Sequence, residues 1–375
     1  MTATATPTPR WPLPLRAGFR FVFSYLILYL FDPTGEGLPH TVLNHLGVST
    51  RMLHPLRIPW EAAVKWTGEH VFGVAIAGVT SGASDNTYGW VNMACRTAIA
   101  LAATLLWSWL DRRRLGYVTA HEFLRGLVRL YLVLSLLVFA SVKAIPLQFE
   151  EINWADLLVT FGEQSPSGLL WRFMGASPGY TSACGIVEIV GLLLLLSRRT
   201  TLLGALLCAG ALANVLALNL WYQVGVIIVS AHMLVMALFL IAPDARRLAD
   251  LLLWHRAVPA VRFPPLFQRA WLERAVTVCK YGVFLLLATK MLWTFYNVRS
   301  AMIAAAKAQP LAGIWTVEEQ ELDGQVLPPL VNDARRWKYL IIQQGNGPLA
   351  ILRPMSGGDI RFQLEISEQS RSFKL

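Results

Sequence analysis

The sequence has little charge for its length. Only 15% of its 375 residues are charged while 55% are hydrophobic, and the mean hydropathy is +0.48. A soluble domain carries about 25% charged residues, so this composition excludes a soluble globular protein. The net charge of +10 does not point to a nucleic-acid-binding protein, because basic residues concentrate in the cytoplasmic loops of membrane proteins.

Patterns typical of metal and redox centres are also missing. The four cysteines form no CxxC pair and no zinc-ligand spacing. Four histidines, His40, His45, His54 and His70, share one segment but match no zinc pattern, so we interpret them as surface residues. The sequence predicts no metal site, and it contains no motif for a protein-bound cofactor.

Hydrophobic blocks of roughly 20 residues are abundant, and this length crosses a hydrocarbon core about 30 Å thick. They cover residues 17–31, 88–110, 124–144, 180–196, 201–220, 224–242 and 276–296. No small-x-small cleavage site follows the first block, so we interpret it as a retained anchor. We therefore predict an all-α polytopic membrane helix bundle of about seven spans over residues 1–309.

Arginines flank alternate ends of these blocks. They precede the first block (Arg10, Arg16) and follow the second (Arg112, Arg113, Arg114) and the fourth (Arg198, Arg199), and six more lie between the sixth and seventh (Arg246, Arg247, Arg256, Arg262, Arg269, Arg274). Because cytoplasmic loops collect basic residues, we expect a bacterial inner (cytoplasmic) membrane protein. Its N-terminus is then cytoplasmic and its C-terminal domain periplasmic or extracellular.

Two segments outside the spans have a pattern of their own. The amphipathic stretch from Trp60 to Val79 is expected to lie as a helix on the outer membrane surface. Residues 310–375 contain strand-like runs separated by DG, GNGP and SGGD turns, which predict a small antiparallel β-meander domain. The sequence stops on a strand at Leu375, so a partner, the membrane helices or further strands of a longer domain would cover the open edge.

Polar residues inside the hydrophobic blocks are the candidates for function, because burying charge in a bilayer is costly. We assign Glu188 and His232 as catalytic proton carriers, and four others as ligand-binding: Arg96, Asn214, Asn219 and Lys290. By depth, all of these except Asn214 fall in the outer half of the spans, where one outward-opening cavity would hold them. The alternatives are structural: Glu188 would pair with Arg96 or Lys290, and His232 and the asparagines would bond neighbouring helices.

Several segments, taken in order, resemble bacterial DoxX-like integral membrane proteins. They are FRFVFSYLILYLF, SGASDNTYGWVNM, SPSGLLWRFMGASPGYTSACGIVEIVGLLLLLSRRTTLLGALL and NVLALNLWYQVGVIIVSAHMLVMALFLIAPDARRL, and the tail from Gly313 resembles the C-terminal β extension of longer members. The positions that match are Glu188, Asn214, Asn219, Tyr222 and His232. Gln223, Gly225 and Ile227 stand where relatives tend to have an acidic residue, Pro and Lys.

The resemblance implies a helical bundle linked, in some relatives, to quinone and sulfur-compound oxidation. One hypothesis is therefore a quinone- or thiol-linked redox component in which buried acid and imidazole groups move protons. The other is a non-enzymatic membrane subunit or assembly partner that docks another protein through its helices and its β-domain. Both hypotheses expect contact with the lipid bilayer and a protein partner in a membrane complex, and neither involves nucleic acid.

The orientation can be tested with reporter fusions. Fusions after Leu196 and Ala242 should report a cytoplasmic location because arginines follow both positions. Fusions after Tyr222 and Leu375 should report an external location. A cytoplasmic reporter after Leu375 would overturn both the count of seven spans and the outward-opening cavity.

Overall fold

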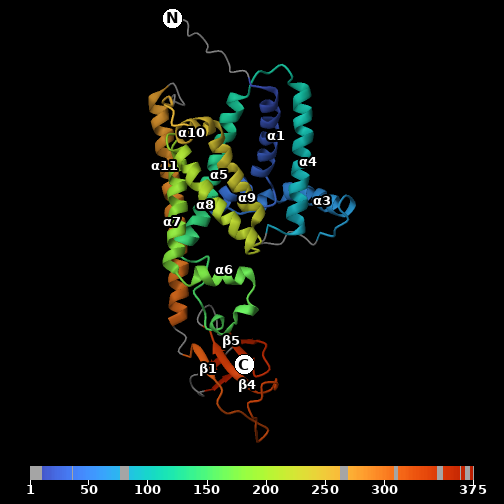
Figure 1. The fold of residues 1–375 in the computed structure, drawn as a ribbon, viewed down its shortest axis with the longest axis vertical. Helices are drawn as coiled ribbons and strands as arrows, with labels where there is room; N and C mark the ends of the chain where they lie inside the picture. The colour runs from blue at the N-terminus through green and yellow to red at the C-terminus, as the bar shows by residue number, and fades with distance from the viewer. Residues whose placement is uncertain are drawn as a thin grey trace. The chain divides into compact units, whose positions relative to one another are not determined.

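The computed structural model describes residues 11–35, 37–76, 84–261, 269–307, 311–343, 349–363, 365–367 and 372–374. The chain divides into two compact units (Figure 1). The helical unit comprises Met1–Ala140 and Ile186–Met291, and the second unit comprises Ser141–Gly185 and Leu292–Leu375. The predicted domain boundary between residues 309 and 310 lies outside the described residues.

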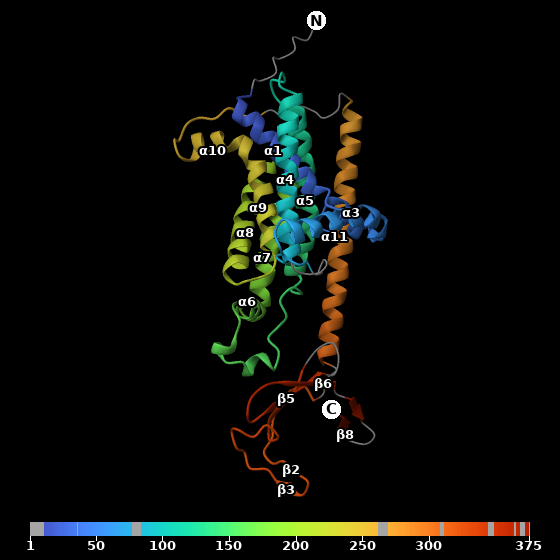
Figure 2. The ribbon, with the colours of Figure 1, turned by 90° about the vertical axis from the view of Figure 1, so that its right-hand side faces the viewer.

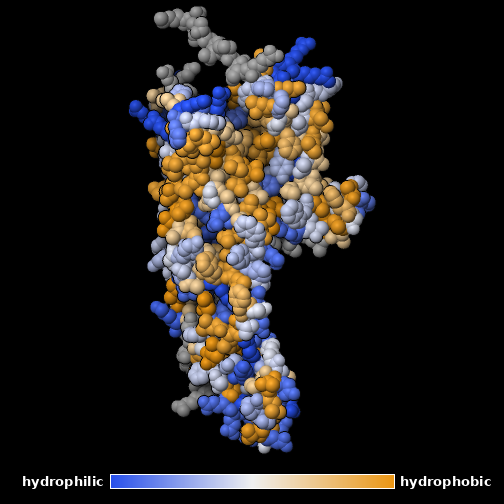
Figure 3. Space-filling model, viewed as in Figure 1, coloured by the Kyte–Doolittle hydropathy of each residue, from blue (hydrophilic) through white to orange (hydrophobic). Residues whose placement is uncertain are grey.

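Seven helices among the described residues are long and apolar enough to cross a membrane. They are α1 (Leu13–Leu30), α4 (Thr87–Leu110), α5 (Val118–Ala144), α7 (Pro178–Leu196), α8 (Thr201–Trp221), α9 (Ile227–Ile241) with its continuation through η4 (Ala242–Asp244) and α10 (Ala245–Leu252), and α11 (Ala270–Lys307). Hydrophobic side chains cover much of their visible surface (Figure 3). The predicted multi-pass membrane helix bundle is confirmed.

Helix α5 is the centre of the helical unit. Leu124, Val128, Leu132 and Leu136 recur at every fourth position, and each is at most 2% exposed. This spacing places them on one face of the helix. They belong to one hydrophobic core with residues of α1, α7, α8 and α9, so α5 orders the spans that surround it.

Helices α7 and α8 approach each other at glycines. A Cβ atom on Gly204 would lie 2.8 Å from the backbone nitrogen of Leu195 and 2.9 Å from the carbonyl oxygen of Gly191. A Cβ atom on Gly191 would lie 2.7 Å from Cys208 Sγ. These small residues let the two helices pack closely, and Gly191 lies about one turn from Glu188 on α7.

The connection from α1 to α4 forms three short helices: α2 (Leu38–Leu46), η1 (Thr50–Leu53) and α3 (His54–His70). Figures 1 and 2 both show α3 running across the direction of α4. The predicted helix from Trp60 to Val79 ends early, at His70, because the chain turns at Gly73, which takes a left-handed φ of 65°. Residues 77–79 of that prediction lie outside the described part.

The second unit contains the predicted β-domain. Strands β1 (Gly313–Thr316), β4 (Trp337–Ile342), β5 (Leu349–Pro354) and β6 (Ile360–Gln363) form an antiparallel sheet in the order β1-β4-β5-β6. Two hairpins accompany it, β2 (Glu321–Leu322) with β3 (Gln325–Val326) and β7 (Glu365–Ser367) with β8 (Ser372–Lys374). The β2–β3 hairpin turns at Asp323 and Gly324, the DG pair of the sequence. Both residues take positive φ, as a tight hairpin turn requires.

Segments that precede α7 belong to the same unit as this sheet. They form η2 (Asp156–Leu158), η3 (Phe161–Glu163) and α6 (Pro166–Gly175). Arg353 on β5 donates a hydrogen bond to the carbonyl oxygen of Leu158 at 2.9 Å and pairs with Asp359 at 2.7 Å. The Asp359 carboxylate raises the pKa of the Arg353 guanidinium, so this arginine stays charged and ties the sheet to the loop.

The glycine contact between α7 and α8 predicts a sharp difference between two substitutions in one helix. Gly204→Ala forces two backbones apart and should destabilise the protein by about 1–3 kcal/mol. Gly210→Ala meets nothing within 4 Å and should be neutral or slightly stabilising, because alanine is the better helix former. Thermal unfolding in detergent measures both, and equal melting temperatures would contradict the close contact.

Candidate functional site

A buried ion pair joins the end of α1 to α4. Arg96 and Asp32 are each 1% exposed, and Arg96 Nη2 contacts Asp32 Oδ2. Charges withdrawn from water in this way are tolerated when they are paired. The partner that the structure gives to Arg96 is therefore Asp32, a residue that the sequence analysis did not consider for this role.

Three further groups hold the Asp32 carboxylate. The backbone nitrogen and the hydroxyl of Thr34 donate to Oδ1, and Asn92 Nδ2 donates to Oδ2 at 3.3 Å. Asn92 in turn accepts a hydrogen bond from Trp60 Nε1 at 2.9 Å. Helix α3, which carries Trp60, is thus linked to the ion pair through one asparagine.

Aromatic rings continue from the ion pair into the bundle. The guanidinium carbon of Arg96 lies 5.1 Å from the centre of the Tyr29 ring, a distance at which a cation is attracted to the ring. The rings of Tyr29 and His232 are stacked 4.1 Å apart, and the rings of His232 and Tyr25 are 5.7 Å apart and nearly parallel. Arg96 and His232, both selected from the sequence, therefore belong to one cluster.

Both nitrogens of His232 are hydrogen-bonded. Nδ1 lies 2.6 Å from the carbonyl oxygen of Ile228, which can only accept, so Nδ1 carries the proton. Nε2 then accepts a hydrogen bond from the hydroxyl of Tyr25 at 2.7 Å. The geometry gives His232 a role in binding α1 to α9, and its assignment as a proton carrier stays a prediction.

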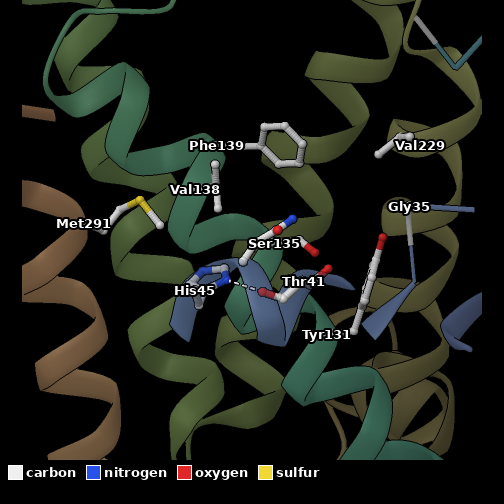
Figure 4. A pocket seen from close by; sticks show the side chains of 10 residues that line it. Gly35, Thr41, His45, Tyr131, Ser135, Val138, Phe139, Val229 and Met291 are labelled. Atoms are coloured by element: carbon white, nitrogen blue, oxygen red, sulfur yellow. Dashed lines mark hydrogen bonds between the residues drawn. The ribbon is translucent and has the colours of Figure 1, made fainter. Parts of the chain in front are cut away.

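A cavity of about 410 Å³ lies beside this cluster (Figure 4). Its lining residues come from the α1–α2 connection and four helices: Gly35, Thr41, Asn44, His45, Tyr131, Ser135, Val138, Phe139, Val229 and Met291. The hydroxyls of Tyr131 and Tyr29 are 3.5 Å apart, so the cavity wall touches the cluster around Arg96. We call this cavity the α2–α5 pocket.

Helix α2 brings two histidines to this region, and both are buried, so the interpretation of His40 and His45 as surface residues was wrong. His45 is 5% exposed, its Nδ1 lies 2.7 Å from the carbonyl oxygen of Thr41, and its own carbonyl oxygen accepts a hydrogen bond from Lys290 Nζ at 3.1 Å. Burial, and secondly the charge of Arg57, lower the pKa of His40. In the described part of the chain, no three His, Cys, Asp or Glu side chains gather to hold a metal ion.

The remaining predicted site residues lie apart from the pocket wall. Asn219 Nδ2 donates a hydrogen bond to Ser230 Oγ at 3.0 Å and thereby joins α8 to α9. This contact matches the alternative prediction for Asn219, that it bonds a neighbouring helix. Asn214 lies on the exposed side of α8, and Glu188 is buried on α7 at 6% exposure. Lys290 reaches the pocket region through its bond to the backbone of α2.

Sequence reasoning missed Asp32 and the polar residues of the pocket. A signal for Asp32 was present, because an acid immediately follows a span while another span carries an unexplained arginine. Tyr131 and Ser135 also had a signal: a spacing of four places both on one face of a span. The sequence contained no signal for His45, because the contacts of this residue depend on how α2 folds against α5.

Comparisons with known proteins place the chain in a family. The uncharacterized protein YwoB of Bacillus subtilis (strain 168) is 30% identical to it over 119 residues, which are 32% of this chain and 75% of that protein. The chain therefore belongs to the family of YwoB. No family model matches the sequence, and no solved structure matches it.

The ion pair predicts large losses of stability from single substitutions. Asp32→Asn leaves Arg96 charged and buried without its counter-ion, and should destabilise the protein by about 3–5 kcal/mol. Adding Arg96→Gln to Asp32→Asn should restore part of this loss. The matched control is Glu61→Gln, which breaks the half-exposed pair with Arg57 and should change stability by about 1 kcal/mol or less. Additive effects of Asp32→Asn and Arg96→Gln in thermal unfolding would refute the coupling.

Proposed function

We propose that this membrane protein binds a quinone-type ligand in the α2–α5 pocket and acts as a redox component of the DoxX-like kind. The observation that carries the proposal is the pocket itself, in which a few polar groups converge within walls that are mainly apolar. Small-molecule sites have this character, and they typically occupy about 300–1,000 Å³. A volume of about 410 Å³ suits a single substituted ring.

The side chains on the wall match the two parts of a quinone. Val138, Phe139 and Met291 offer apolar contacts to the ring and its substituents. The hydroxyls of Tyr131 and Ser135 approach from the same helix and would orient the ring oxygens. This arrangement also fits the resemblance to proteins that are linked to quinone oxidation.

The neighbouring cluster supports proton exchange at the pocket wall. Reduction and oxidation of a quinone need protons to reach and leave its oxygens. Tyr131 lines the pocket, and its hydroxyl is 3.5 Å from that of Tyr29, which lies against the Arg96 guanidinium. In this proposal Tyr131 is the group that contacts the ligand, while Arg96 is a positioning residue.

The proposal includes a location for the reaction. With the N-terminus in the cytoplasm, the end of α1 faces the outside, and the pocket lies in the outer half of the membrane. Electrons would then pass between a freely bound quinone and a protein partner in the same membrane. The β-domain, residues 310–375, would lie outside and be available to that partner.

Ligand content tests the proposal directly. Protein purified from its own membranes in mild detergent should retain quinone that solvent extraction and mass spectrometry detect. Ser135→Trp and Val229→Trp fill the pocket from two helices and should lower the quinone content about tenfold, equivalent to about 1.4 kcal/mol. Leu130→Trp, on the exposed side of α5 at 44% exposure, should retain the full amount.

The purified variants must first match the wild type in melting temperature and in elution volume. Quinone absent from the wild-type protein would contradict the proposal. Equal quinone content in the wild-type and the two filled variants would place the ligand elsewhere and would contradict it as well.

A further inference from the structure

We infer that His45 makes the α2–α5 pocket selective for the reduced, hydroxyl-bearing form of its ligand over the oxidised, carbonyl-bearing form. The inference rests on the proposed function, because it takes a quinone-type ligand as given. It assigns a specificity-determining contact to a residue that neither its sequence pattern nor its position outside the spans had indicated.

The hydrogen on the His45 imidazole ring is located by the hydrogen bond that the ring makes. His45 Nδ1 lies 2.7 Å from the carbonyl oxygen of Thr41, one turn earlier on α2 (Figure 4). A carbonyl oxygen only accepts, so the hydrogen of this bond is on Nδ1. In the neutral ring, the other nitrogen Nε2 then carries a lone pair and acts as an acceptor.

The Nε2 acceptor of His45 makes no hydrogen bond within the described part of the chain. His45 itself is 5% exposed. Buried polar atoms are nearly always hydrogen-bonded, and an unsatisfied one is costly. His45 also lines the pocket. Its Nε2 is closed off from the pocket in this structure, so in this proposal a bound ligand moves a neighbouring side chain of the wall aside and supplies the missing donor.

The two forms of the ligand differ in what they offer to Nε2. A quinol hydroxyl donates a hydrogen bond, so it satisfies Nε2. A quinone oxygen has only lone pairs, and it would face the Nε2 lone pair with no hydrogen between them. Sites that contain a buried hydrogen-bonding group discriminate strongly against ligands that leave it unpaired. The contact therefore favours the reduced form.

Another histidine provides a matched control. His70 Nδ1 lies 3.0 Å from the carbonyl oxygen of Trp66, one turn earlier on α3. Its ring therefore makes the same bond along its own helix, but it is exposed and does not line the pocket. Water satisfies its Nε2, so substitution of His70 leaves the pocket unchanged.

The experiment measures the affinity of the full-length protein in detergent for duroquinone and for duroquinol, by calorimetry under anaerobic conditions. The wild-type protein should bind duroquinol about tenfold more tightly, because duroquinone leaves a buried acceptor unsatisfied and duroquinol does not. His45→Gln offers an amide that can turn to donate or accept, and His45→Leu offers no polar atom. Both variants should bind the two forms with equal affinity, whereas His70→Gln should keep the preference.

Different results overturn different claims. Equal binding of both forms by the wild type, or tighter binding of duroquinone, would refute selection by His45 while leaving a quinone site in place. An unchanged preference in the two His45 variants would also refute it. Binding of neither form by the wild type would remove the proposed function and the inference together. The wild-type comparison does not depend on any variant folding correctly.

Discussion

The contact between Arg96 and Asp32 is the constraint on which the helical unit depends. Both side chains are 1% exposed, and a charged group in such a place is stable only beside its counter-ion. Each surrounding element satisfies part of this pair: Thr34 and Asn92 bind the carboxylate, and the ring of Tyr29 lies beside the guanidinium. The pair thereby fixes where α1 ends and how α4 faces it.

The position of the pocket follows from the same constraint. Directly after Asp32 the chain folds back so closely that a Cβ atom on Gly37 would lie 2.5 Å from the Asp32 carbonyl oxygen and 2.8 Å from its nitrogen. Glycine is thus required where α2 begins. This tight return places Thr41 and His45 over α5, where Tyr131 completes the wall.

Much of the fold follows from the sequence alone. The number and position of the seven spans were predictable because hydrophobicity over about 20 residues is a local property. The ends of two helices were not, because α11 runs from Ala270 to Lys307 and the sixth span continues to Leu252, well beyond their apolar blocks. The DG turn and the strands around it were predictable for the same reason, since turn chemistry acts over neighbouring residues. Arg96 also stood out, because charge within an apolar block is conspicuous.

The contacts between residues that are distant in the sequence could not be predicted from the sequence alone. Asp32 and Arg96 are separated by 64 positions (96 − 32), and nothing in the local pattern of either residue specifies the other. The polar atoms of the pocket come from ordinary residue types, Thr41, Tyr131 and Ser135, which occur in many spans without a ligand. Whether these residues form a pocket depends on the packing of α2 against α5, which is a property of the folded chain.

The most direct measurement of the central claim is a density map of the protein from its native membranes, at a resolution that shows side chains. Our account predicts a planar density in the α2–α5 pocket, against Phe139 and Met291, with an edge at the Tyr131 hydroxyl. The Asp32 and Arg96 side chains should remain in contact behind it. A pocket closed by its own side chains, or filled by a continuous lipid chain, would contradict the account.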